Sequence, residues 1–171
     1  GKTTCCLMVA IDKAKKNEKV LYLDTENGFS IERIKQIVKA TNKKDYKEII
    51  ENIIVISIDT FEKQIKTFEN LKEIVENGLI GLVIIDTMGK QYRKALREDH
   101  SAANNAMNKQ MREIKNVLDK TSAEIVITNQ VYADFKNEGE VEMVGGKMIR
   151  NWSDNIIELK KIDGKREIIL A

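Results

Sequence analysis

Four groups of residues in this chain are of the types that suit phosphate and magnesium chemistry. The first is the opening stretch Gly1-Lys2-Thr3-Thr4, which matches the second half of the phosphate-binding pattern G-x-x-x-x-G-K-[ST]. In such a loop the backbone N–H groups hold phosphate, the lysine reaches the outer phosphates and the hydroxyl of Thr3 would bind Mg²⁺. The first glycine and the strand that feeds the loop would lie upstream of Gly1. The alternative is a chance tetrapeptide that opens a surface helix.

Carboxylates follow two strand-like runs. LVIID ends on Asp86, where a carboxylate can hold magnesium through its water shell; the alternative is a cap or turn aspartate. LYLDTE places Glu26 just past a second strand end, where a carboxylate can orient, or take a proton from, the water that attacks a γ-phosphate. Asp24, two residues earlier, is a rival for that role.

An amide pair, Asn129 and Gln130, closes the run IVITNQ. An amide there can contact a γ-phosphate and change position when the phosphate leaves, although ordinary loop hydrogen bonding is the alternative. The four groups occur in order on a chain of alternating strands and helices. Together they indicate nucleotide binding.

The spacing of apolar residues predicts the elements that position these groups. Helical periodicity covers residues 3–17, 30–40, 60–77 and 106–120, and strand-like runs cover 19–26, 52–59, 78–87 and 123–130. Strands that alternate with helices predict an α/β fold with a mostly parallel sheet and helices on both faces. Residues 155–163 and 165–171, joined by Asp163-Gly164, predict an antiparallel hairpin at the sheet edge. In such a sheet, ligands bind at the carboxyl ends of the strands.

Composition limits the class of protein. The 171 residues, 42% of them apolar, suffice for a single domain over residues 1–171. The net charge of +2 gives no global attraction to nucleic acid, so any polyanion site must be local. Neighbouring Cys5 and Cys6 suit packing rather than a disulfide, and one histidine is too few for a usual zinc site. With no membrane-spanning run or leader, we expect a cytoplasmic protein without membrane contact.

Five segments, GKTT, LYLDTENGFS, LVIIDT, IVITNQVYAD and GGKMIRNWSDNIIEL, resemble the ATPase core of the RecA superfamily, and specifically its archaeal RadA and RadB members. The resemblance covers nearly the whole chain and implies a RecA-like P-loop fold with ATP and Mg²⁺ as cofactors. It also implies roles for individual positions. They are Gly1, Lys2, Thr3 and Thr4 at the phosphates, Thr3 and Asp86 at magnesium, Glu26 as the catalytic carboxylate, and Gln130 as the amide that couples nucleotide state to DNA.

One departure decides between members of the superfamily. Strand-exchange recombinases carry a long DNA-binding loop after TNQV, but here only the acidic stretch VYADFKNEGEVEMV separates Gln130 from Gly145. Together with Trp152 in NWS, this resembles RadB, which implies a recombination accessory factor that binds single- and double-stranded DNA, acts with the RadA recombinase and hydrolyses ATP poorly. The alternatives are a RadA-type strand-exchange core, a KaiC-type regulatory ATPase, or an inert scaffold that lacks the upstream half of the phosphate loop.

The segment GKQYRKALREDH is the candidate DNA surface, in the place of the superfamily's first DNA loop. Cations could pair with phosphates there and an aromatic ring could stack a base; a solvated basic loop is the alternative. The residues are Lys90, Tyr92, Arg93, Lys94 and Arg97. A second basic cluster, Lys160, Lys161, Lys165 and Arg166, is interpreted as protection of an edge hairpin. In a homo-oligomer, Lys147 and Arg150 could reach a neighbour's nucleotide, and Trp152 is expected to anchor the core or an interface.

Overall fold

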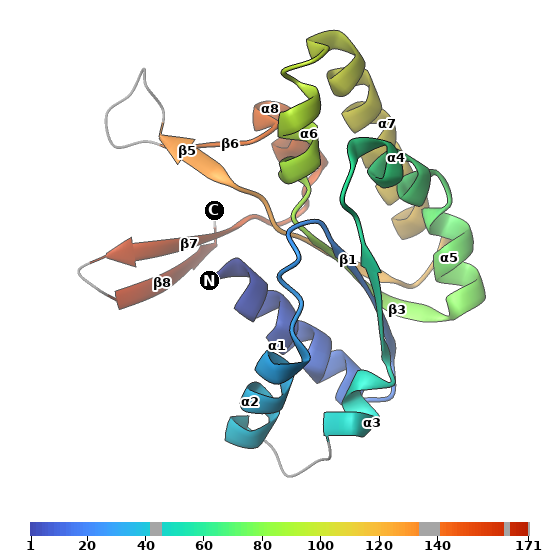
Figure 1. Ribbon diagram of the computed structural model, residues 1–171, viewed down its shortest axis with the longest axis vertical. Coiled ribbons are helices and arrows are strands. Elements are labelled where there is room, and N and C mark those ends of the chain that lie inside the picture. The colour runs from blue at the N-terminus through green and yellow to red at the C-terminus, as the bar shows by residue number, and fades with distance from the viewer. Residues whose placement is uncertain (42–45, 134–140, 163–164, 171) are drawn as a thin grey trace.

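A four-stranded parallel sheet forms the centre of the protein. The computed structural model describes residues 1–41, 46–133, 141–162 and 165–170. Within them the strand order is β2-β1-β3-β4, and helices cover both faces (Figure 1). The strands are β1 (Lys19–Asp24), β2 (Ile53–Ser57), β3 (Ile80–Asp86) and β4 (Glu124–Ile127). This arrangement confirms the predicted α/β fold.

Alternation along the strands divides the apolar residues between two cores. Val20 and Tyr22 of β1 face one core, whereas Leu21 and Leu23 face the other. The first core is covered by α1 (Lys2–Lys15), α2 (Ile31–Thr41) and α3 (Tyr46–Ile50). The second is covered by α4 (Phe61–Glu69), α5 (Leu71–Gly78), α6 (Gly89–Ala95), α7 (His100–Lys120) and α8 (Gly146–Trp152). Both layers of helices therefore pack against the same two central strands, β1 and β3.

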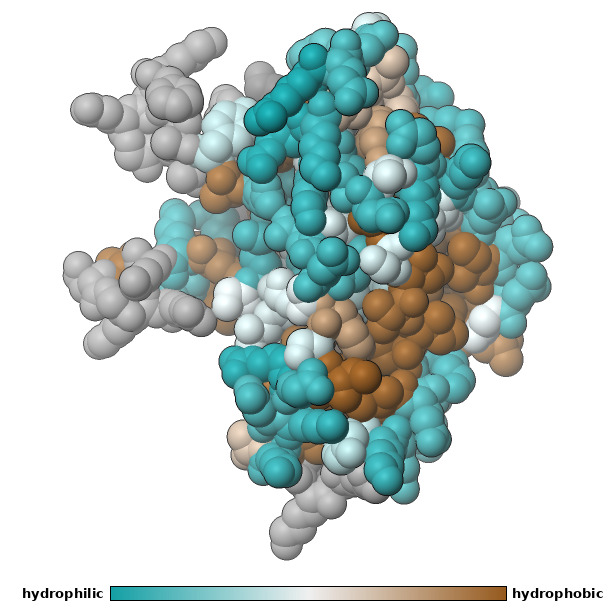
Figure 2. All heavy atoms as spheres, viewed as in Figure 1, coloured by the Kyte–Doolittle hydropathy of each residue, from teal (hydrophilic) through white to brown (hydrophobic). Residues whose placement is uncertain are grey.

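Two of the four strands are less buried than the sequence suggests. β2 lies at an edge of the sheet, and Ile54 and Val55 are 43% and 38% exposed, so its prediction as a buried strand was wrong. β4 lies at the other edge of the described sheet, where Ile125 and Ile127 are partly buried against one core and Val126 against the other. Figure 2 shows apolar surface over β2.

Two helical segments also differ from prediction. The helix expected over 60–77 is divided at Asn70, whose side-chain amide donates to the carbonyl of Lys66 at 3.0 Å and so competes with the helix ladder. The segment expected to be a polar lead into the helix at 106 instead forms α6 and the first turns of α7. α7 begins where Asp99 accepts a hydrogen bond from the N–H of Ala102 at 2.9 Å.

The carboxyl-terminal part forms two antiparallel pairs. β5 (Val131–Ala133) pairs with β6 (Val141–Met143), a short ribbon that the sequence did not predict. β7 (Ile157–Ile162) pairs with β8 (Lys165–Leu170) as the predicted hairpin. Within the described residues this hairpin is a separate sheet and does not join the edge of the central one. The Asp163-Gly164 turn and the acidic residues 134–140 lie outside the described residues. None of the helices described could span a bilayer.

Candidate nucleotide site

The paired ends of β1 and β3 form the base of the candidate site. Asp24 of β1 lies opposite Asp86 of β3 in the parallel register. The Asp24 carboxylate accepts backbone N–H bonds from Glu26 at 3.0 Å, Gly28 at 3.1 Å and Phe29 at 2.9 Å. A carboxylate so occupied shapes the loop that follows the strand. This geometry favours Glu26 over Asp24 as the group that acts on water.

Glu26 is exposed and lies between two polar partners. Its Oε1 accepts a hydrogen bond from Nε2 of Gln130 at 2.5 Å and one from the hydroxyl of Thr87 at 3.3 Å. Gln130 follows β4, and Thr87 follows β3, where the Asp86–Thr87 peptide bond is cis. The structure thus brings together the carboxylate and the amide that the sequence placed more than a hundred positions apart.

Asp86 is buried and held by two hydroxyl groups. Tyr22 donates to its Oδ2 at 2.8 Å, and Thr128 donates to its Oδ1 at 2.5 Å. Burial, followed by the hydrogen bond to Asp86, raises the pKa of Tyr22 well above its ordinary value, so the phenol remains a donor. With both oxygens engaged, Asp86 suits contact with a metal through its water shell better than direct ligation.

The amino end of α1 lies against this base. Gly1 precedes the helix, and the N–H groups of Lys2, Thr3 and Thr4 stand in the first turn, where no helical carbonyl is available to them. A Cβ at Gly28 would come within 3.4 Å of the Thr3 side chain, so Thr3 adjoins the loop after Glu26. Burial raises the pKa of the Cys6 thiol to about 12, with Asp86 reinforcing and Lys2 opposing the shift. The charges of Asp86 and Lys2 therefore both act on the Cys6 thiol in α1.

Asn129 is held by hydrogen bonds within the chain. Its Nδ2 donates to the carbonyl of Val144 at 2.5 Å, and its Oδ1 accepts the N–H of Gln130 at 3.0 Å. Of the predicted amide pair, it is Gln130 whose side chain reaches Glu26. A Cβ at Gly89 would lie 2.6 Å from Oδ1 of Asn129, so only glycine allows α6 to start this close to it.

The candidate DNA segment is a helix rather than the loop that was predicted. Arg93, Lys94 and Arg97 are exposed and Lys90 is half-buried, and their spacing places these four on one face of α6 and its last turn. The fifth residue faces the other way. Tyr92 is only 3% exposed and its hydroxyl donates to Oδ1 of Asn104 at 2.5 Å, so the stacking role predicted for Tyr92 is not supported.

Comparison with known proteins was made for the whole chain. The Rad51 family model matches residues 2–170. The chain belongs to the Rad51 family. Its relatives include the DNA repair and recombination protein RadB of Methanococcus maripaludis strain C7, which is 35% identical over 99% of this chain and 76% of that protein. The protein of the same name from Methanosphaera stadtmanae is 32% identical over 94% of this chain and 68% of that protein.

A solved structure agrees with these relatives. The crystal structure of the RadB recombinase superposes with a TM-score of 0.79, at 25% identity, over 99% of this chain and 74% of that one. The predicted resemblance to RadB and the RecA-like core are thereby confirmed. The chain spans 76% of the length of the Methanococcus maripaludis protein and 74% of the chain in the RadB crystal structure.

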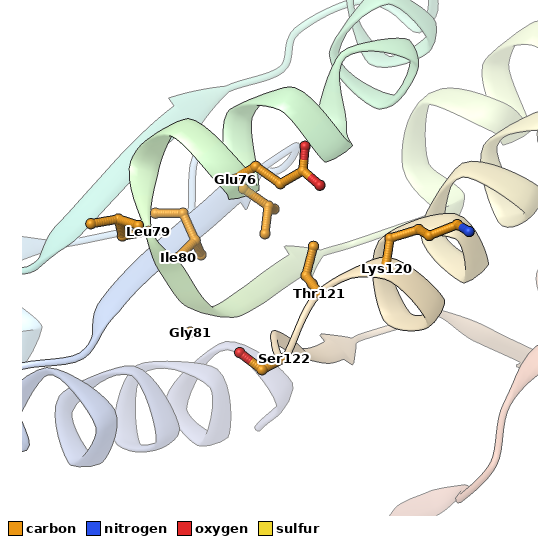
Figure 3. A pocket seen from close by; sticks show the side chains of 8 residues that line it. Glu76, Leu79, Ile80, Gly81, Lys120, Thr121 and Ser122 are labelled. Carbon is orange, nitrogen blue, oxygen red and sulfur yellow. The ribbon is translucent and has the colours of Figure 1, made fainter.

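One cavity in the described part of the chain lies away from this site. It has a volume of about 370 Å³ and lies between the end of α5 and the end of α7, at the amino ends of β3 and β4 (Figure 3). Glu76, Lys120 and Ser122 are among the residues that line it. Because ligands of open parallel sheets bind at the carboxyl ends of strands, we place the site at Asp86 and not in this cavity.

Sequence reasoning missed the hydroxyl groups that support the site. Tyr22 and Thr128 hold Asp86, while Thr25 and Thr87 join the two strand ends. The signal in the sequence was a polar residue within, or directly after, a strand of otherwise apolar residues. Buried polar groups require partners, and at a strand end those partners lie on the neighbouring strand.

Proposed function

We propose that the protein is an ATP- and Mg²⁺-binding, DNA-binding accessory factor of homologous recombination and DNA repair, with residues 1–171 acting as one ATPase domain. One observation carries the proposal: in a Rad51-family chain, Glu26 lies beside the strand end of Asp86 and bonds to Gln130. An inert scaffold would not need an exposed carboxylate held in this way.

The residues present fit a nucleotide with its metal. The first-turn N–H groups of α1 and the ammonium of Lys2 would hold the phosphates, with Gly1 and Thr4 at the loop backbone. The Thr3 hydroxyl and the Asp86 carboxylate would hold Mg²⁺, the latter through water. When bound, the metal would supply positive charge near the outer phosphates. Glu26 would orient the attacking water and accept its proton.

Weak hydrolysis follows from how Glu26 is engaged. The same oxygen, Oε1, accepts from both Gln130 and Thr87. For Oε1 to bind the attacking water, the 2.5 Å bond from Gln130 would have to be replaced by one from that water, which would slow turnover. We infer that Gln130 moves to the γ-phosphate in that step.

The basic face of α6 is the proposed DNA surface for single and double strands. None of Lys90, Arg93, Lys94 and Arg97 pairs with a carboxylate within the part of the chain that the structure describes. Unpaired cations on one face are free to neutralise phosphates and release counterions. With Tyr92 turned inward, contact would be with the backbone and insensitive to base sequence.

The proposal includes two kinds of protein partner. A RadA-type recombinase is the expected protein partner, and a homo-oligomer is possible on the same family grounds. Arg150 is exposed on α8, where it could reach a neighbour's nucleotide, and Trp152, 37% exposed, is no core residue and stays a candidate interface anchor. Lys147 also lies in α8, and its side chain is outside the described part of the structure.

The deciding experiment is ATP hydrolysis by the protein extended upstream to the length of its relatives, with Mg²⁺, with and without single-stranded DNA. Turnover should be slow, indifferent to DNA and abolished in Glu26→Gln. Strong stimulation by DNA that is lost in Glu26→Gln would instead indicate a strand-exchange motor of the RadA type. No retention on DNA at low salt would favour a regulatory ATPase that recognises protein.

DNA binding is tested by charge reversal. Lys94→Glu should weaken oligonucleotide binding and reduce the slope of log affinity against log salt by about 0.7 to 0.9 for each lost phosphate contact. Lys39→Glu, an exposed change on α2 on the opposite face of the sheet, is the matched control and should leave both quantities unchanged. Equal loss in the two variants would mean that only net charge matters and that α6 is no specific surface.

A further inference from the structure

The middle residue of the DTE stretch, Thr25, makes a set of bonds that none of the roles above requires. Its hydroxyl donates to the carbonyl of Thr87 at 2.9 Å and accepts the N–H of the same residue, also at 2.9 Å. Its own backbone N–H donates to the carbonyl of Asp86 at 2.9 Å. Each threonine is 2% exposed, so water cannot replace these bonds without a local opening.

The bonds between Thr25 and Thr87, here called the clamp, lie just beyond the last paired residues of β1 and β3. The register of β1 and β3 ends at Asp24 and Asp86, and beyond it the two chains separate, one toward α2 and the other into α6. The Thr25 side chain takes the place of one further backbone rung. It therefore holds together two chain segments at the point where the ladder no longer can.

The clamp joins the neighbours of the two carboxylates. Thr25 directly precedes Glu26, and Thr87 directly follows Asp86. The Thr87 hydroxyl in turn donates to Oε1 of Glu26 at 3.3 Å. A shift of Thr87 would thus move the support of Glu26 and the attachment of Asp86 together.

We propose that Thr25 is a positioning residue that fixes the separation and orientation of Glu26 relative to Asp86. A water aligned by Glu26 and a metal held by Asp86 must meet the same phosphate, and small misplacements of such groups reduce rate strongly. Thr25 acts through its bonds to Thr87 and to the carbonyl of Asp86. The inference rests on the proposed nucleotide function.

The test compares Thr25→Val with Thr25→Ser in the protein extended to the length of its relatives. Valine has the shape of threonine but makes neither hydroxyl bond, whereas serine keeps both. We expect kcat for MgATP to fall about tenfold or more in Thr25→Val with KM changed by less than about twofold, and to stay close to the wild type in Thr25→Ser. Such a split indicates lost alignment rather than lost binding.

Thr121→Val is the matched control. The Thr121 hydroxyl also makes two bonds, to the carbonyl of Val117 at 2.8 Å and from the N–H of Ala123 at 3.2 Å, but it lies at the opposite end of the sheet beside the cavity of Figure 3. This variant should lower stability and leave kcat unchanged. Should Thr25→Val not fold, Thr25→Ala, which removes the hydroxyl together with the methyl group, replaces it with the same expected fall in kcat.

The outcomes of these measurements distinguish failure of the positioning role from failure of the proposed function. If the wild type hydrolyses ATP and kcat is the same in Thr25→Val and Thr25→Ser, the positioning role is overturned and the proposed function remains intact. A fall of kcat in Thr121→Val as large as in Thr25→Val would also overturn it, since general destabilisation would then suffice. Absence of turnover in the wild type would overturn the proposed hydrolysis, and the positioning role with it.

Discussion

Removal of the Tyr22 hydroxyl tests how strongly the base of the site is held. Tyr22 is fully buried and donates to Asp86 at 2.8 Å, and phenylalanine would keep its ring and its edge contact with Phe29, whose ring centroid is 5.2 Å away. Tyr22→Phe therefore removes one hydrogen bond to a charged acceptor and changes almost nothing else. It also leaves a buried carboxylate with one protein donor fewer.

The magnitude follows from the type of bond. A hydrogen bond to a charged group contributes about 1.5–3 kcal/mol, and one between neutral groups about 1 kcal/mol. Tyr22→Phe should lower the free energy of unfolding by about 2 kcal/mol, which is roughly 4–8 °C in Tm for a domain of this size. Tyr92→Phe, which loses the neutral bond to Asn104, should cost about half as much.

Urea unfolding of the purified variants, followed by circular dichroism, measures these differences. The control is Tyr46→Phe, in which the ring under the Lys35 ammonium, 4.9 Å away, is retained. We expect the loss of stability to decrease in the order Tyr22, Tyr92, Tyr46, with an unchanged dependence on urea concentration. A loss for Tyr22→Phe no larger than for Tyr46→Phe would refute the argument that this hydroxyl holds Asp86.

Three further predictions concern stability. Gln64 donates to Oε1 of Gln110 at 2.7 Å, but Oε1 of Gln64 and Nε2 of Gln110 find no partner among the described residues; the double change to leucine should be neutral or stabilising in urea unfolding, whereas Gln110→Leu alone should cost about 1–3 kcal/mol. The pKa of Cys6 is raised from 9.0 to about 12, so the folded state keeps a proton that the unfolded state loses. Unfolding free energy should therefore fall by about 1.4 kcal/mol between about pH 8 and pH 10, and Cys6→Ala should lack this part of the fall. Leu79 is 83% exposed in a left-handed conformation with φ 50°, so Leu79→Gly should raise the free energy of unfolding by roughly 0.5–1 kcal/mol in thermal unfolding.

Much of the fold follows from local pattern. The alternation of apolar runs with helical periodicity predicted all four strands of the central sheet, and the reason is clearest for β1 and β3, since a strand buried on both faces needs a continuous run of apolar side chains. Strand order and edge position did not follow, since pairing joins segments far apart in the chain. The exposure of Ile54 and Val55 on β2 is a consequence of that order.

The candidate site likewise followed in part from local sequence pattern and in part only from the tertiary structure. The sequence indicated Glu26, Asp86 and Gln130 because each follows a strand-like run, and parallel strands bring their carboxyl ends to one edge. It left Asp24 and Glu26 as rivals, since both are carboxylates at one strand end. The structure favours Glu26 because the chain turns back after Asp24, so that three N–H groups point at that carboxylate and occupy most of its acceptor sites.

Orientation around helix α6 was decided by packing. The sequence grouped Tyr92 with Arg93 and Lys94 as one polar surface, because a loop was expected. In a helix, neighbouring residues point about 100° apart, so the cations face solvent while Tyr92 turns into the core toward Asn104. Sequence by itself determined which residue types stand at each strand end and hence the class of chemistry. Only the tertiary structure decided which internal hydrogen bonds each of them makes, because these depend on how the chain turns after a strand and on which distant segments lie beside it.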